Sequence, residues 1–265
     1  MKNSKLYTIL SLSLILSACT KVIDLKLGND SGKLVIEANV TNANAPQIIK
    51  LSKNVAFTTT NTYPPVSGAT VTVTDQTGQI YRFTEGVSGT YTNSQLKGIA
   101  GYTYTMSVLT GSITYAASSK MPASVAIDSV TSKNNAFSSG SNPTKEISVH
   151  YHDPAGVPNY YLCVMSINGV QVKNVFAFDD EFNDGLAVSE VLRETDIDIH
   201  AGDKITVEMQ CLDKPIYTYW FTLSQQSANG PGGSVTPSNP PTNISPVSLG
   251  YFSAHTTQSI TIIAK

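Results

Sequence analysis

The sequence predicts a mainly β protein made of two β-sandwich-like units, of immunoglobulin or transthyretin type, with one α-helix packed near the C-terminus. Three observations support this fold class. Thr, Ser, Val, Ile, Tyr and Gly are abundant, while charged residues make up only 14% of the chain, a composition that suits sheets with many turns. Apolar and polar residues alternate in short runs, and Gly- or Asn-containing turns separate these runs.

The first unit is expected at residues 33–122, after a tether at 19–32. Alternation begins at Leu34 and ends at the Met121-Pro122 pair. The expected strands follow one another closely around positions 34–40, 49–51, 68–75, 81–83, 89–91, 101–108 and 113–117. Thr110-Gly111-Ser112 fits a tight hairpin. About seven short strands in such a span describe one sandwich of immunoglobulin-like size.

The second unit is expected at residues 123–265. Its strands are predicted at 126–130, 147–151, 160–167, 170–178, 196–200, 204–212, 249–253 and 258–263. Asn168-Gly169 between two apolar runs is the strongest hairpin signal in the chain. Long polar loops are expected at 54–67, 133–144 and 229–246. These loops and the edge strands are the surfaces expected to contact other molecules.

A helix is predicted at about 215–228, because Pro215 stands at a first-turn position and Gly230-Pro231-Gly232-Gly233 ends the pattern. The aromatic run from Tyr217 to Phe221 resembles a sugar-stacking platform. Helical spacing instead places Ile216, Trp220 and Leu223 on one stripe, with Tyr217 and Phe221 on the next. A helix lying on a sheet needs such a stripe for its own burial, so we expect core packing.

Residues 1–18 have the pattern of a bacterial lipoprotein signal peptide. Lys2 and Lys5 precede an apolar run from Leu6 to Leu16, and Ser17-Ala18 leads into Cys19. That run is shorter than the roughly 20 residues of a spanning helix. We expect cleavage before Cys19, a thioether to diacylglycerol and an acylated amine carrying a chain such as palmitate. At about 0.8 kcal/mol per buried methylene, several acyl chains hold a protein to a bilayer.

Thr20 and Lys21 follow Cys19, so an aspartate that would retain the protein in the inner membrane is absent. The sequence therefore predicts an outer-membrane lipoprotein, whose periplasmic or cell-surface orientation stays open. Loss of Lys2 and Lys5 changes the formal net charge from −2 to −4. Since no block of basic residues is present, nucleic acid is not an expected partner.

Two cysteines remain beyond the anchor, Cys163 and Cys211, each within an apolar strand-like run. An oxidising compartment would permit a disulfide between them. Two buried free thiols are the alternative. A zinc pair has no CxxC spacing to support it.

Two segments are candidates for metal ligands. His150 and His152 alternate on a predicted strand, so both imidazoles point to one face and could bind zinc. Against this, Ile147, Val149 and Tyr151 take the opposite face, which leaves the histidines toward solvent. Asp153 points away from them unless the strand bends at Pro154.

The second candidate is an acidic segment with partial calcium-loop spacing. Its possible ligands are Asp179, Glu181, Asn183 and Glu190. Asp184 occupies the sixth position, where a calcium loop has glycine, and Gly185 comes one residue late. The alternative is a hairpin end with a solvated acidic tip. No metal or other cofactor is therefore expected, with calcium and zinc as the weaker alternatives.

The chain resembles a Bacteroidetes lipoprotein family known as domain of unknown function 4249, often encoded beside TonB-dependent outer-membrane receptors. The segments that carry this resemblance are 34–38, 66–71, 89–91, 159–161, 178–185, 215–223, 240–244 and 250–252. The resemblance implies a partner for such a receptor and implies no chemistry.

The expected function is that of a non-catalytic accessory or binding component of TonB-dependent nutrient uptake, whose small-molecule or peptide ligand the sequence does not identify. No Gly-x-Ser-x-Gly, HExxH or phosphate-binding glycine loop is present, so an enzyme is not expected. The alternatives are a structural or adhesive surface module that binds another protein and, third, a metal-dependent enzyme that uses His150 and His152.

Overall fold

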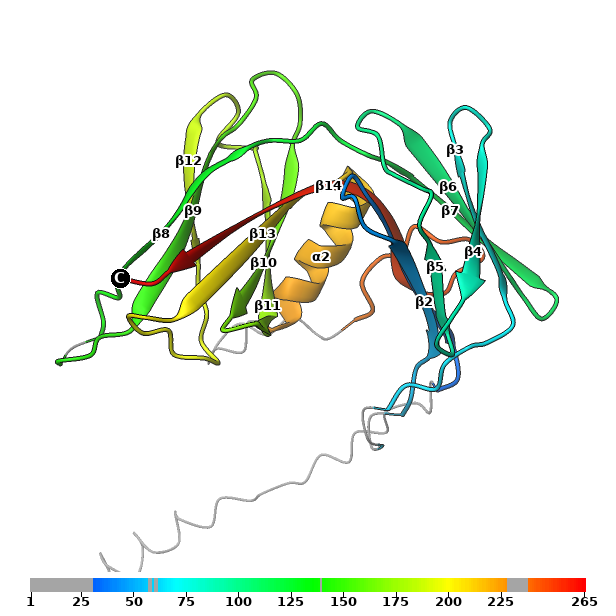
Figure 1. Ribbon diagram of the computed structural model, residues 1–265, viewed down its shortest axis with the longest axis horizontal. Coiled ribbons are helices and arrows are strands. Elements are labelled where there is room, and N and C mark those ends of the chain that lie inside the picture. Colours follow the sequence, from blue (N-terminus) through cyan, green and yellow to red (C-terminus); the bar gives the residue numbers. More distant parts are fainter. Residues whose placement is uncertain (1–30, 57–58, 60–61, 139, 228–237) are drawn as a thin grey trace, which may run out of the picture.

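A computed structural model describes residues 31–56, 59, 62–138, 140–227 and 238–265. The predicted signal peptide, Cys19 and most of the tether lie outside the described residues, as do parts of the three predicted loops. The chain is mainly β, with large sheets and a helix near the C-terminus, which confirms the predicted fold class (Figure 1). No helix among the described residues is long and apolar enough to cross a membrane.

The strands follow the predicted alternation, with local departures. The first half contains β1 (Leu34–Thr41), β2 (Gln47–Lys53), β3 (Thr70–Asp75), β4 (Ile80–Glu85), β5 (Thr90–Asn93), β6 (Thr103–Thr110) and β7 (Ile113–Lys120). The second half contains β8 (Ile127–Asn134), β9 (Lys145–His152), β10 (Tyr160–Ile167), β11 (Val170–Asp179), β12 (Ala187–Leu192), β13 (Lys204–Cys211), α2 (Lys214–Ser227) and β14 (Leu249–Ile263).

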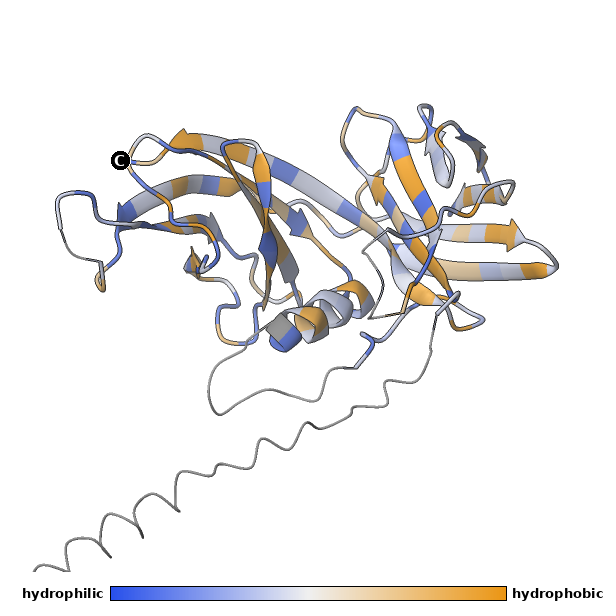
Figure 2. Cartoon of the chain, turned by 90° about the horizontal axis from the view of Figure 1, so that it is seen from below, coloured by the Kyte–Doolittle hydropathy of each residue, from blue (hydrophilic) through white to orange (hydrophobic). Residues whose placement is uncertain are grey.

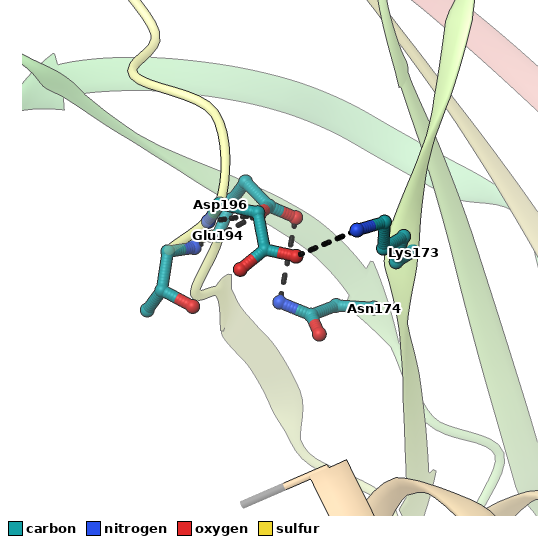
Figure 3. A network of polar contacts seen from close by, with 5 residues as sticks. Lys173, Asn174, Glu194 and Asp196 are labelled. Atoms are coloured by element: carbon teal, nitrogen blue, oxygen red, sulfur yellow. Dashed lines mark hydrogen bonds and ion pairs between the residues drawn. The ribbon is translucent and has the colours of Figure 1, made fainter. Parts of the chain in front are cut away.

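The prediction of a strand at 196–200 is wrong, because the structure has no strand there. The alternation pattern also failed to predict β12. The carboxylate of Glu194 explains the difference: it accepts hydrogen bonds from the backbone N–H groups of Thr195 and Asp196, which makes a turn (Figure 3). Asn174 on β11 also donates to Glu194, at 3.4 Å. Asp196 lies 4.0 Å from the ammonium group of Lys173 on β11, so Glu194 and Asp196 together hold this loop against β11 (Figure 3).

Strand β14 joins the two halves of the molecule. The long sheet has eleven strands within the described chain, in the order β11-β10-β13-β14-β1-β2-β5-β4-β3-β6-β7. Residues 249–255 of β14 pair in parallel with β1, and residues 256–263 pair antiparallel with β13. The two predicted closing strands are therefore one continuous strand. Its first part extends the N-terminal sheet and its second part the C-terminal one (Figure 1).

The N-terminal core lies inside the curled half of the long sheet. Ile36, Ala38 and Val40 are fully buried there, as alternation predicts, and hydropathy alternates along these strands (Figure 2). The curl brings β7 back to β14, where the backbone N–H of Ala254 donates to the Ser119 hydroxyl at 2.9 Å. The first unit is thus a single curled, sandwich-like sheet, whose strand β7 returns to β14.

The C-terminal unit has three layers. The short sheet, of order β12-β9-β8, packs on one face of the β11-β10-β13-β14 part of the long sheet, and α2 packs on the other face. Strand β10 contributes Tyr161 and Cys163 to the core between the sheets, and Leu162 to the core under the helix. Burial on both faces explains why Tyr160–Ile167 is almost continuously apolar.

The N-terminus of α2 is fixed to the first unit by Asp213. One carboxylate oxygen accepts from the backbone N–H of Ile216 at 3.2 Å, which caps the helix just before Pro215. The other oxygen accepts from the Ser119 hydroxyl at 2.8 Å and from the N–H of Lys120 at 3.2 Å. Burial raises the pKa of Asp213, and these donors partly offset that effect. One side chain therefore links the helix to β7.

Candidate functional site

A cavity of about 430 Å³ lies where the long sheet passes from one unit to the other, beside α2. Its volume falls in the range of about 300–1,000 Å³ that is typical of small-molecule sites. Five strands (β1, β2, β10, β13 and β14) and the helix contribute side chains to it. The residues that line it are Glu37, Asn39, Thr41, Pro46, Gln47, Ile48, Lys50, Leu162, Glu208, Gln210, Trp220, Tyr251 and His255.

The polar walls of this junction cavity follow from strand alternation. On β1 the apolar residues face the N-terminal core, so Glu37, Asn39 and Thr41 point to the opposite face. On β13, Glu208 and Gln210 likewise alternate with residues of the C-terminal core. In an isolated sandwich this face would meet solvent. Here α2 and the neighbouring strands of the junction partly cover it.

The aromatic wall comes from α2 and β14. The Trp220 and Tyr251 rings meet edge to face, with centroids 5.2 Å apart and planes at 62°. Tyr219 packs on Tyr251 from the same helix, with centroids 5.0 Å apart. These contacts bear out core packing for the helix, since Trp220 and Tyr219 pack against the buried cluster under α2. Trp220 also reaches the cavity.

Hydrogen bonds and charges hold several cavity groups in place. Gln210 donates to the Glu208 carboxylate at 2.7 Å, and Asn39 donates to the Tyr251 hydroxyl at 3.4 Å. Lys50 lies opposite Glu37 in the β1–β2 register.

Burial also changes the acidity of the two tyrosines beside the cavity. Burial raises the pKa of Tyr251 to about 12. Burial also raises the pKa of Tyr219, and the nearby Glu37 carboxylate adds to this effect.

His255 lines the same cavity from β14 and is only 3% exposed. Its Nδ1 atom lies 2.8 Å from the hydroxyl of Ser253, which is itself buried. Burial lowers the pKa of His255 to about 4, because the imidazolium would lose its hydration there. At neutral pH the cavity therefore contains an uncharged imidazole.

The two predicted zinc ligands lie outside this cavity, on the outer face of the short sheet. The Nε2 atom of His150 is 2.8 Å from the Thr131 hydroxyl, while His152 is exposed. Ile147, Val149 and Tyr151 take the buried face. Among the described residues, one group of three possible ligand side chains lies close enough together to hold a metal ion. Neither histidine belongs to that group.

The predicted calcium ligands are dispersed. Asp179 accepts from the Tyr217 hydroxyl at 2.9 Å, and Glu190 lies within β12, where burial raises its pKa. The carboxylates that do meet, within 4.8 Å of one another, are Asp153, Asp180 and Asp184. The sequence pattern missed this group because Asp153 comes from the end of another strand.

Each of the three carboxylates already has a hydrogen-bond donor. Asp153 is fully buried and accepts from the Tyr161 hydroxyl and, at 3.3 Å, from the N–H of Gly185. Asp180 accepts from the N–H of Asn159 at 2.8 Å, and Asp184 from that of Gly156 at 2.6 Å. These bonds tie the 154–159 loop to the 180–185 turn.

The Cys163 and Cys211 thiols are free and buried in the structure, so the disulfide alternative is not formed there. The strand register gives the reason. Cys163 lies opposite Met209 and Cys211 opposite Tyr161, so the cysteines are diagonal neighbours. Diagonal Cβ atoms are about 7 Å apart, well beyond the roughly 4 Å of a disulfide. Burial raises the pKa of both thiols.

Sequence reasoning missed the junction cavity, although it identified the strands that form it. The available signal was the polar half of each alternating strand, which reads as solvent-facing without the fold. Three segments that carry the family resemblance, 34–38, 215–223 and 250–252, contribute Glu37, Trp220 and Tyr251. Glu37 and Tyr251 lie side by side because β1 pairs with β14, and Trp220 reaches them because α2 packs on Tyr251.

Fold and site together define a two-unit β protein with a partly open polar and aromatic cavity at the junction. The chain belongs to the family described as a domain of unknown function (DUF4249), whose model matches residues 20–261. A search of curated proteins finds no match.

Two solved structures are similar over parts of their length. One is a DUF4785 family protein from Legionella pneumophila, at 11% identity and a TM-score of 0.24, covering 68% of this chain and 52% of the other. The second is the Yersinia pseudotuberculosis adhesin InvE, at 20% identity and a TM-score of 0.22, covering 69% and 57%. The chain thus spans just over half the length of each.

Proposed function

We propose that this protein is an outer-membrane-anchored lipoprotein that acts as a non-catalytic binding component of a TonB-dependent nutrient uptake system. The observation that carries the proposal is the junction cavity, whose volume and mixture of aromatic and polar groups suit a small ligand. The signal-peptide pattern ending at Cys19 supports the location. The family resemblance supports the partner.

A binding role is favoured over catalysis by the state of the cavity groups. One oxygen of the Glu208 carboxylate accepts a hydrogen bond from Gln210. Ser253, whose hydroxyl lies beside His255, is only 2% exposed and lies outside the cavity lining. A serine nucleophile would have to meet its substrate. A lipid anchor, by contrast, confines a binding protein to the membrane plane and raises its effective concentration near a receptor.

Affinity purification tests the partnership. We expect the full-length protein, purified from detergent-solubilised outer membrane, to co-elute with a TonB-dependent receptor. We also expect a strain that lacks the protein to take up that receptor's nutrient more slowly. A preparation without any receptor, together with unimpaired uptake in the deletion strain, would leave the uptake proposal without support. Recovery of a different surface protein would favour the adhesive alternative.

The lipid anchor makes a separate prediction. Cys19→Ser is expected to abolish incorporation of radiolabelled palmitate and to move the protein from the membrane pellet to the soluble fraction. The reason is that acyl chains, at about 0.8 kcal/mol per buried methylene, supply the membrane affinity. The buried Cys163→Ser is the control and should keep its label. Unchanged labelling and sedimentation of Cys19→Ser would refute the anchor.

A further inference from the structure

We propose that the junction cavity is a carbohydrate site that takes an uncharged sugar of about one or two rings. The inference rests on the proposed binding role and names the ligand class of that same cavity. It depends on the aromatic wall, on the hydrogen-bonding groups of the same lining and on the near balance of charge among the lining residues.

The aromatic wall offers an apolar face with a polar edge. Trp220 is half-buried, and Tyr251 holds it edge to face, so the indole orientation is set before a ligand enters. No hydrogen bond within the described chain uses the indole N–H of Trp220. A pyranose ring has an apolar C–H face and a rim of hydroxyls, so it can pack on such a ring and accept a bond from that N–H.

The polar part of the lining presents both donors and acceptors. Glu208 and Gln210 are joined through a single pair of atoms, Gln210 Nε2 and Glu208 Oε1, which leaves the Gln210 carbonyl and the second Glu208 oxygen for a ligand. The Glu37 carboxylate makes no ion pair within 4 Å among the described residues. Each hydroxyl of a sugar both donates and accepts, so it can satisfy adjacent groups of either kind.

The charges favour a neutral ligand over an ion. Two carboxylates, Glu37 and Glu208, face one ammonium group, Lys50, and the imidazole of His255 is buried on the same surface. A phosphate or sulfate would meet two carboxylates with one cation to offset them. A monovalent organic cation would offset the charge of one carboxylate, but it could not pair with the Lys50 ammonium group. Hydroxyl groups pair with all of these side chains without adding charge.

The chain contains one tryptophan, so its fluorescence reports directly on this cavity. The experiment uses the full lipidated protein in a zwitterionic detergent without a sugar headgroup. Cellobiose, xylobiose, chitobiose and maltose are titrated separately, with choline, a cation, and glycylglycine, a zwitterion, as charged comparison ligands. We expect a saturable change in Trp220 emission with at least one disaccharide and none with the charged ligands.

Variants test whether the cavity itself binds the sugar. Trp220→Ala is expected to weaken binding of the responding disaccharide about tenfold by calorimetry, and Gln210→Ala about fivefold. Phe221→Ala is the matched control, because Phe221 neighbours Trp220 on the same helix, is 41% exposed and lies outside the lining. It should bind as the wild type does. Gln210→Ala removes no aromatic contact, so it keeps the test informative if Trp220→Ala fails to fold.

The proposal is overturned if none of the four disaccharides changes the emission, if choline or glycylglycine binds instead, or if Gln210→Ala and folded Trp220→Ala bind as tightly as Phe221→Ala. These titrations need no transporter. A failure here therefore leaves the co-elution with a receptor unaffected, and a missing receptor leaves the titrations unaffected.

Discussion

Replacing Gly250 with alanine is expected to destabilise the protein by more than about 4 kcal/mol, which would prevent stable folding. Gly250 has φ +92°, in the left-handed region, and lies opposite Ile36 in the parallel β1–β14 pair. A Cβ atom there would lie 2.0 Å from the Ile36 carbonyl oxygen and 2.8 Å from its carbon. Both atoms belong to the backbone, so no side-chain rotation relieves the clash.

The surroundings prevent β14 from moving away. Tyr251 and Phe252, the next two residues, are buried in the cores on opposite faces of the sheet. Any shift of the strand would also break its pairing with β13 and hence the connection between the units. The clash therefore has to be absorbed by loss of the β1–β14 contact.

Denaturant unfolding monitored by circular dichroism measures this effect. Gly78→Ala is the matched control, because Gly78 has nearly the same φ, +88°, and nothing lies within 4 Å of the added Cβ. Gly78→Ala should lower the free energy of unfolding only by the cost of placing alanine in the left-handed region, about 1–2 kcal/mol. Equal midpoints for the two variants would show that the close approach of β14 to β1 is not what requires glycine at position 250.

The second large effect concerns acid, and it comes from His255. Its pKa is about 4 in the folded protein, because burial disfavours the imidazolium, against 6.5 as a model value. The unfolded chain therefore binds a proton that the folded chain does not bind between these two pH values. The contribution of the neutral His255 side chain to the free energy of unfolding is fully present above pH 6.5 and is lost as the pH falls toward 4. The loss reaches about 3 kcal/mol below pH 4.

Two buried carboxyl groups change the pH dependence of stability in the direction opposite to His255. Burial raises the pKa values of Glu190 and Asp213, so the folded state holds their protons more tightly than the unfolded state does. Their contributions to stability fall as the pH rises through their folded pKa values. The wild-type curve is the sum of these effects, and the difference between wild type and a His255 variant isolates the histidine.

The measurement is the free energy of unfolding from pH 7 to pH 4 for wild type and His255→Gln. We expect the variant to lose less stability than the wild type over this range, by about 3 kcal/mol at its lower end. His152→Gln is the control, because His152 is exposed on the outer face of β9. Parallel curves for wild type and His255→Gln would mean that the imidazole is protonated in the folded protein above pH 4.

The local elements were predictable because they depend on short-range patterns. Alternation identified β1, Asn168-Gly169 identified the β10–β11 hairpin, and Pro215 marked the first turn of α2. The segment 196–200 failed because a carboxylate, Glu194, competes for backbone N–H groups there. No periodic pattern reports such a bond between a side chain and the backbone.

The candidate site was much less predictable than the strands. Single segments suggested ligand sets at 150–152 and 179–190, whereas the carboxylates that meet and the groups that line the cavity come from segments far apart in the sequence. Strand pairing decides such meetings, and a parallel pair such as β1–β14 leaves no local turn to mark it.

Composition, alternation and turn residues act over a few neighbouring positions, so they were enough to predict the fold class and the order of most elements, and the quoted motifs carried the resemblance to the family. The double role of β14 and the cavity between polar strand faces could be seen only in three dimensions. Alternation shows which residues share a face of a strand, but long-range pairing and the packing of α2 decide whether that face meets water or another part of the chain.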